Sequence, residues 1–358
     1  MTAADSDVLT RLLAVLAEPL APGTPLPPGE DEAAWRARAE AAARSLAAQF
    51  DAPAGFDHTL GSALRYAADT PMPTGLAESP GRTRLVGELV RNLDTPDRIN
   101  QGHKGTCSVA CVEAWLSEVQ PAEYARLVAE LMDLDGEGRL LNGEVISRDE
   151  DRLAWGEAEA RRSPASRLFQ VAAMEYAYPD LDYCNLADGQ FSDDGSDTGT
   201  GLGLDAFDRL LEGLTGTRWD RLSRSDQATS RAMAERFGLD LATLPDLERD
   251  APAIIRSSLA AGDGVFVTLD ARLMAGEDPP DAPTDPLLLF PHKVRVLRID
   301  DPTERVWYDD PLDPEKPWMP GVETVVETAG GHCSMSAADF FALVVELSCR
   351  PEHTRQTG

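Results

Sequence analysis

A cysteine at the expected start of a helix is the first residue in this chain whose position favours chemistry. Cys107 follows a glycine-bearing loop over residues 100–106, and apolar residues then recur at helical spacing as far as Val119. A thiol attacks carbonyl groups as its thiolate, which the dipole and N–H groups of a helix N-terminus stabilise. The pattern predicts that Cys107 is a nucleophile for acyl transfer.

Acyl transfer also requires hydrogen-bond donors for the oxyanion that develops on the substrate. The backbone N–H of Cys107 is one candidate donor. The side-chain amide of Gln101, which precedes the cysteine across Gly102 and Gly105, is the second. A hydrogen bond from Gln101 to its own loop is the alternative role for this side chain.

An imidazole base and an acidic partner are expected at the ends of two neighbouring strands. His292 opens a run of β-forming residues, and Arg305–Tyr308 predicts the next strand, which Asp309 and Asp310 follow. A turn at Asp300-Asp301-Pro302-Thr303 would pair the two strands. Because side chains alternate along a strand, only one of the two aspartates can face the imidazole.

The ordered set of these residues resembles the active site of papain-like cysteine peptidases, nearest to the branch that includes bacterial double-glycine leader peptidases. The resemblance rests on Gln101-Gly-His-Lys-Gly-Thr-Cys107 before a helix and on His292 followed by Asp310-Pro311. It covers about residues 98–135 and 262–348. It implies that Gln101 supplies the oxyanion hole, Cys107 the nucleophile, His292 the base and Asp310 the orienting acid.

The same resemblance selects between the two aspartates, because it places the acid directly before a proline. Pro311 supports this choice by restricting Asp310 to an extended backbone. Asp309 is then expected to point to solvent or to cap the turn. Two positions depart from the family: Ser108 stands where papain has tryptophan, and Lys293 stands where a small or apolar residue is usual. These departures concern the substrate groove more than the chemistry.

The resemblance implies cysteine-dependent hydrolysis of peptide bonds, with a peptide or protein as substrate and with no cofactor and no metal. Deamidation or transamidation of glutamine on a partner protein uses the same four residues and is an alternative. An inactive papain-like module that binds a peptide or protein is an alternative outside the enzyme class.

Other histidines and cysteines allow competing interpretations. His103 lies close to Cys107 and is a rival base, although the sequence shows no partner to orient it. His332 follows two glycines, is expected in a turn and is a second reserve base. Cys107 and Cys111 with His332 and Cys333 would give a zinc site, whereas core packing is the simpler role for Cys111.

The elements expected around these residues are helices first and an antiparallel sheet later, an α+β arrangement. Helices are predicted near residues 30–50, 107–119, 121–132, 164–176, 205–214, 225–237 and 245–261 and after Ser336, and strands near 264–269, 292–299, 305–308 and 324–327. Residues 135–150 predict a hairpin, and residues 189–203 predict a loop rich in glycine and aspartate. Residues 1–95 are expected to form a separable helical extension or cap. Residues 96–358 are expected to form the papain-like domain, with an inserted helical and loop region at about 135–260.

Composition and charge exclude several classes of protein. The chain has 62 Asp and Glu against 33 Lys and Arg, a net charge of −29, which disfavours nucleic acid and anionic membrane surfaces as partners. It has no apolar stretch long enough to span a membrane and no basic region of a signal peptide. Its five cysteines are sparse and odd in number, which favours a reducing compartment. We expect a cytoplasmic protein, or one exported without a cleaved signal peptide.

Overall fold

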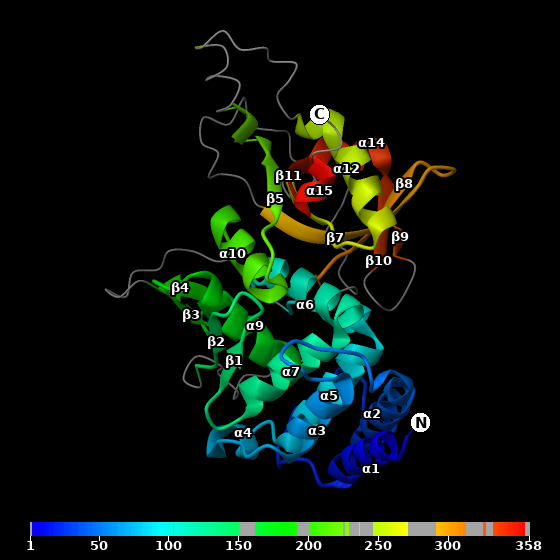
Figure 1. Cartoon of the computed structure of the whole chain (residues 1–358), viewed down its shortest axis with the longest axis vertical. Helices are drawn as coiled ribbons and strands as arrows, with labels where there is room; N and C mark the ends of the chain where they lie inside the picture. Colours follow the sequence, from blue (N-terminus) through cyan, green and yellow to red (C-terminus); the bar gives the residue numbers. More distant parts are fainter. Residues whose placement is uncertain are drawn as a thin grey trace. The chain divides into compact units, whose positions relative to one another are not determined.

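The computed structural model describes residues 2–102, 104–149, 162–191, 201–224, 226–228, 236, 246–270, 291–312, 325–326 and 332–354. The chain divides into two compact units, Met1–Gly216 and Thr217–Gly358. Helices make up most of the first unit, and the second is built on an antiparallel sheet (Figure 1). The α+β prediction is therefore confirmed.

The helices of the first unit are α1 (Ala3–Ala17), α2 (Glu32–Leu46), α3 (Leu60–Asp69), α4 (Thr74–Glu78), α5 (Arg82–Asp94), α6 (Cys107–Val119), α7 (Pro121–Met132), α9 (Pro164–Ala177) and α10 (Leu204–Thr215), with the 3-10 helices η1 (Ala47–Gln49) and η2 (Pro96–Arg98). Two small hairpins join β1 (Glu137–Arg139) to β2 (Val145–Ser147) and β3 (Asp182–Cys184) to β4 (Gly189–Phe191). The predicted helices from residue 107 to 214 and the predicted hairpin at 135–150 are confirmed. The Gly-rich loop lies mostly outside the described residues.

Helix α5 is enclosed by the other helices of the first unit. Its residues from Thr83 to Leu93 are buried, and it contacts α1, α2, α6, α7 and α9. Gly87 permits the close approach to α2, because a Cβ atom there would lie 2.3 Å from Cζ2 of Trp35. The expected boundary near residue 95 therefore lies inside one compact unit, since α5 packs against helices on both sides of that boundary.

A buried carboxylate ties α5 to its neighbours. Glu88 is fully buried and accepts hydrogen bonds from the indole of Trp35 and from the guanidinium groups of Arg84, Arg91 and Arg98. Burial alone would raise the pKa of Glu88, but the three guanidinium groups outweigh it and lower that pKa to about 2. The cluster links α5 to α2 and η2 through charge-assisted hydrogen bonds.

In the described part of the second unit, the strands lie in the order β5-β11-β6-β7-β8-β10-β9, and each pair is antiparallel. Their bounds are β5 (Asp220–Ser223), β6 (Phe266–Asp270), β7 (Pro291–Asp300), β8 (Arg305–Asp309), β9 (Val325–Val326), β10 (His332–Ser336) and β11 (Val344–Cys349). The helices are α12 (Leu247–Ala261), α14 (Ala337–Leu343) and α15 (Pro351–Thr354). The four predicted strands are confirmed as β6 to β9, and the helix predicted at 225–237 lies mostly outside the described residues.

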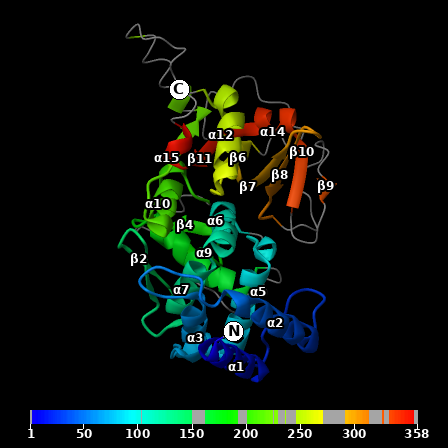
Figure 2. The same cartoon turned by 45° about the vertical axis from the view of Figure 1, so that its right-hand side comes forward.

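The two faces of this sheet differ in chemistry. One face packs against α12 and α14 (Figure 2), and its apolar core includes Val267, Val294, Val306, Leu347, Ile254 and Phe340. The opposite face carries buried polar side chains: Lys293 Nζ lies 3.1 Å from Glu346 Oε1, and the Thr268 hydroxyl donates to Glu346 Oε2 at 2.6 Å. Alternation along each strand separates the two sets.

Candidate active site

Helix α6 begins at Cys107, where the sequence predicts a helix start. The cysteine is partly exposed, whereas the next residue, Ser108, is buried. Thr106 occupies the N-cap position but makes no capping hydrogen bond with its side chain; its hydroxyl donates instead to Gln170 Oε1 at 2.8 Å. The N–H groups of the first turn are thus not capped by Thr106, and the positive end of the helix dipole lies at the cysteine.

The loop before α6 is held by hydrogen bonds from within and from outside. Gly102 turns the chain with φ of 63° and donates its N–H to Asn100 Oδ1 at 2.9 Å. The N–H of Gly105 donates to both carboxylate oxygens of Asp188, each at 2.8 Å. Asp188 lies in the turn between β3 and β4, and burial raises the pKa of its carboxyl group. The segment next to Cys107 is therefore fixed to a neighbouring hairpin.

Gln101 folds its side chain over the same loop. Nε2 donates to the Lys104 carbonyl oxygen at 2.6 Å, and Oε1 is buried without a hydrogen-bond partner among the described residues. An amide nitrogen carries two N–H donors, so one of them is committed to the loop. The role of Gln101 as an oxyanion donor stays a prediction. His103, the rival base, lies outside the described residues.

His292 and Asp310 form a hydrogen-bonded pair in the second unit. His292 Nε2 lies 2.8 Å from Asp310 Oδ1, and both side chains are buried to about nine-tenths. Because β7 and β8 pair Arg295 with Asp309, His292 and Asp310 are diagonal neighbours on one face of the sheet. Asp310 Oδ1 also accepts the N–H of Leu312 at 2.9 Å, which fixes the carboxylate. The sequence argument for Asp310 rather than Asp309 predicts this contact.

Asp309 points to the opposite face of the sheet. Its carboxylate lies 3.4 Å from Arg295 Nη2, and both residues are buried. The expectation that Asp309 faces solvent or caps the turn is wrong, because β8 continues through this residue and lies between β7 and β10. The departure at Lys293 is accommodated on the same face, where that side chain pairs with Glu346.

His332, Cys333 and Cys349 lie in strands of the second unit. His332 is the first residue of β10, opposite Asp309, so the expectation of a turn is wrong: pairing with β8 begins there. Burial, and then the charges of Asp310 and Asp309, raise the pKa of Cys333 to about 12. Burial likewise raises the pKa of Cys349 to about 12. Within the described ranges, no group of three or more His, Cys, Asp and Glu side chains is arranged to hold a metal ion.

Two buried residues, Gln170 and Glu113, are not singled out by the sequence analysis. Gln170 contacts the nucleophile loop, which comprises residues 100–106, and Glu113 contacts Gln170. Gln170, on α9, donates Nε2 to the Asn100 carbonyl oxygen at 3.1 Å and to Glu113 Oε2, on α6, at 2.8 Å. In the sequence, each of these residues is a polar residue within an apolar helical run. Gln170 lies within Leu168-Phe-Gln-Val-Ala172, and Glu113 lies within Val109-Ala-Cys-Val-Glu-Ala-Trp-Leu116.

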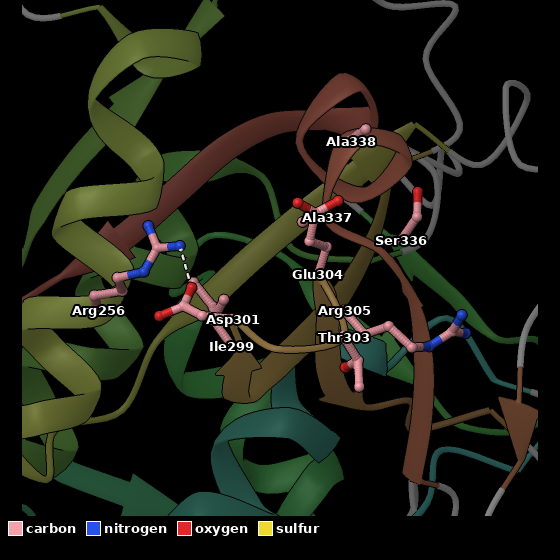
Figure 3. Close-up of a pocket in the computed structure, with 9 residues that line it drawn as sticks. All are labelled: Arg256, Ile299, Asp301, Thr303, Glu304, Arg305, Ser336, Ala337 and Ala338. Atoms are coloured by element: carbon pink, nitrogen blue, oxygen red, sulfur yellow. Dashed lines mark hydrogen bonds and ion pairs between the residues drawn. The ribbon is translucent and has the colours of Figure 1, made fainter.

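Figure 3 shows a surface pocket in the second unit, which is lined by residues of α12, of the turn between β7 and β8 and of the start of α14. Its volume is about 390 Å³, and it adjoins the turn between β7 and β8, at the other end of β7 from His292. Arg256 Nη2 pairs with Asp301 Oδ1 at 2.7 Å across it. The guanidinium of Arg305 donates to Ser334 Oγ at 3.0 Å and to its carbonyl oxygen at 2.8 Å. These cations are bonded within the protein, and the pocket adds no residue to the candidate site.

No protein-family model, curated protein or solved structure matches the chain. Of the helices in the described ranges, none is both long and apolar enough to cross a membrane.

Proposed function

We propose that the chain is a papain-like cysteine hydrolase that cleaves amide bonds in a peptide or protein substrate. The observation that carries the proposal is the hydrogen bond of 2.8 Å between His292 Nε2 and Asp310 Oδ1. A cysteine hydrolase needs an imidazole whose one ring nitrogen is held by an acceptor while the other takes the proton of the thiol. Since Asp310 engages Nε2, the proposal assigns Nδ1 of His292 to the thiol of Cys107.

The distribution of elements supports the same proposal. In the papain-like fold, a helix that bears the nucleophile packs on an antiparallel sheet that carries the base. Here α6 begins at Cys107 among the helices of the first unit, and β7 and β8 carry His292 and Asp310 in the sheet of the second. The proposal requires that these residues act on one substrate carbonyl in the active protein.

The proposed reaction has two steps. His292 Nδ1 takes the proton of Cys107, and the thiolate attacks the substrate carbonyl carbon. The oxyanion accepts hydrogen bonds from the Cys107 N–H and the Gln101 amide. The imidazolium, stabilised by Asp310, then protonates the leaving nitrogen as the C–N bond breaks, which leaves a thioester on Cys107. A water molecule, deprotonated by His292, hydrolyses the thioester and regenerates the thiol.

Cleavage of proteins in a lysate tests this proposal. The purified chain and its Cys107→Ala variant are incubated with a proteome lysate, and mass spectrometry records new peptide termini and deamidated glutamines. We expect new termini with the wild type and none with Cys107→Ala, whose circular dichroism should match the wild type. Cys184→Ala is the matched control, because Cys184 is a partly exposed thiol on β3 outside the proposed site, and it should keep full activity.

Two results would contradict the proposal. Deamidated glutamines that depend on Cys107, without new termini, would replace peptide hydrolysis by action on glutamine side chains. If the wild type and Cys107→Ala give identical products, Cys107 catalyses no reaction in this lysate. A module that binds a peptide or protein would then be the remaining alternative.

A further inference from the structure

The side chain of Gln170 is hydrogen-bonded to both ends of the nucleophile loop, residues 100–106, which directly precedes Cys107. Gln170 lies on α9 and is fully buried. Its Nε2 donates to the carbonyl oxygen of Asn100, the residue before Gln101, at 3.1 Å. Its Oε1 accepts from the hydroxyl of Thr106, the residue before Cys107, at 2.8 Å. One amide therefore holds the residues that precede both candidate catalytic groups.

The other hydrogen-bonding positions of this amide are also occupied. Nε2 donates to Glu113 Oε2 at 2.8 Å, and Oε1 accepts from Arg162 Nη1 at 3.3 Å. A primary amide offers two donors and two acceptor sites, so Gln170 uses all four. Arg162 can only donate and the Asn100 carbonyl can only accept. These two partners therefore fix the orientation of the amide, with Oε1 toward Arg162 and Nε2 toward Asn100.

Glu113 connects this amide to the rigid interior of the first unit. Glu113 is fully buried, and its Oε1 accepts from the Tyr124 hydroxyl of α7 at 2.7 Å. The Tyr124 hydroxyl accepts in turn from Nδ2 of Asn92, on α5, at 3.0 Å. The loop over residues 100–106 is thus tied through Gln170 to α5, α6 and α7. Loops are mobile unless anchored, whereas catalytic groups must be held to within about 0.5 Å.

We propose that Gln170 is the positioning residue of the nucleophile loop. This inference rests on the proposed function, because it assigns Gln170 a part in the reactivity of Cys107. Gln170 acts through Thr106. Its hydrogen bond to the Thr106 hydroxyl holds the start of α6 in place, and with it the first-turn N–H groups, which favour a thiolate at Cys107. Without this hydrogen bond, the first turn is no longer held at the cysteine and the thiol would ionise at higher pH.

The rate of Cys107 alkylation by iodoacetamide, measured against pH by mass spectrometry, tests the inference in the full chain. Gln170→Leu and Thr106→Val each break the bond between the amide and the hydroxyl. Each should shift the profile upward by about one pH unit and lower the rate near pH 6 by about tenfold. Thr106→Ser restores the hydroxyl and should restore the wild-type profile.

Ser117→Ala is the matched control for a lost buried hydrogen bond. The Ser117 hydroxyl, also on α6, donates to the Asn92 carbonyl oxygen at 2.9 Å and is buried, and its removal should leave the alkylation profile unchanged. Wild-type profiles in folded Gln170→Leu and Thr106→Val would overturn the inference, and Thr106→Val decides alone if Gln170→Leu does not fold. A wild-type Cys107 that shows no acid-shifted reactivity at all would instead contradict the proposed function, and the inference would fall with it.

Discussion

The two adjacent aspartates at the end of β8, Asp309 and Asp310, have different partners. Asp310 is bonded to His292, and Asp309 is paired with Arg295 on the other face of the sheet. We expect Asp310→Asn to lower turnover by about tenfold or more and to change the pH–rate profile, because asparagine does not stabilise the imidazolium. Asp309→Asn should leave that profile unchanged and lower the free energy of unfolding by about 1–3 kcal/mol, because it weakens a buried ion pair.

Turnover against pH and urea denaturation of both variants check this pair of expectations. A normal profile for Asp310→Asn beside an altered one for Asp309→Asn would reverse the assignment. Normal pH–rate profiles for both variants would show that neither aspartate orients the histidine during catalysis.

The loop bond of Gln101 sets a condition on its proposed role. Since one N–H of its amide donates to the Lys104 carbonyl, the oxyanion must be bound by the other. Gln101→Ala should lower the rate by about a hundred- to a thousandfold with substrate binding kept. Lys104→Ala is the control, because it leaves the backbone carbonyl in place, and it should be near normal. Steady-state kinetics decide: a Gln101→Ala rate within about threefold of wild type would place the oxyanion hole elsewhere.

Helix α6 carries a titratable group within its buried face. Burial raises the pKa of Glu113 from 4.5 to about 6. The folded state therefore holds this proton more tightly than the unfolded state does. Ionisation of Glu113 should lower the free energy of unfolding by about 2 kcal/mol as the pH rises through the window between those two values, and no further above it.

Glu113→Gln should lack this dependence, because its amide stays neutral and can still accept a hydrogen bond from Gln170. Urea denaturation of both proteins from about pH 4 to pH 8 measures it. The stability of the variant relative to the wild type should rise across the window and then become constant. A relative stability that is independent of pH would show that Glu113 ionises normally in the folded protein.

Periodicity along the chain was enough to predict α6, α7 and the β7–β8 hairpin, because each is a local pattern with clear boundaries. The contact of His292 with Asp310 does not follow from hairpin pairing and alternation alone, because the register shifts between Val296 and Arg298. Without this shift Asp309, not Asp310, would share the face of His292. The prediction of Asp310 comes instead from the family resemblance, which places the acid directly before Pro311. The burial of Asp309 does not follow, because β10 joins the sheet from a distant part of the sequence. The four hydrogen-bond partners of Gln170 likewise lie in separate segments of the chain. A local sequence pattern therefore cannot predict these contacts.

For the whole molecule, the packing of the N-terminal helices bears on whether residues 1–95 can be removed. Helix α5 is buried along its length, and α3 and α5 both contact α7. Deletion of residues 1–95 would remove α3 and α5 and expose the buried face of α7 that they cover, and we expect the truncated chain to lose cooperative unfolding. Thermal denaturation followed by circular dichroism checks this. A truncated chain with a sharp transition would show a separable extension, as composition alone indicates.

The proposed hydrolase requires that a cysteine of the helical unit and a histidine of the sheet unit act together. Alkylation of Cys107 by iodoacetamide across the pH range, in the intact chain and in His292→Ala, measures this cooperation, with Cys184 as an internal reference thiol. We predict that Cys107 reacts much faster than Cys184 near pH 6, because an imidazolium at His292 stabilises its thiolate, and that His292→Ala removes most of the difference and leaves only the smaller contribution of the α6 N-terminus. Equal reactivity of the two thiols at that pH, unchanged by His292→Ala, would contradict the proposal.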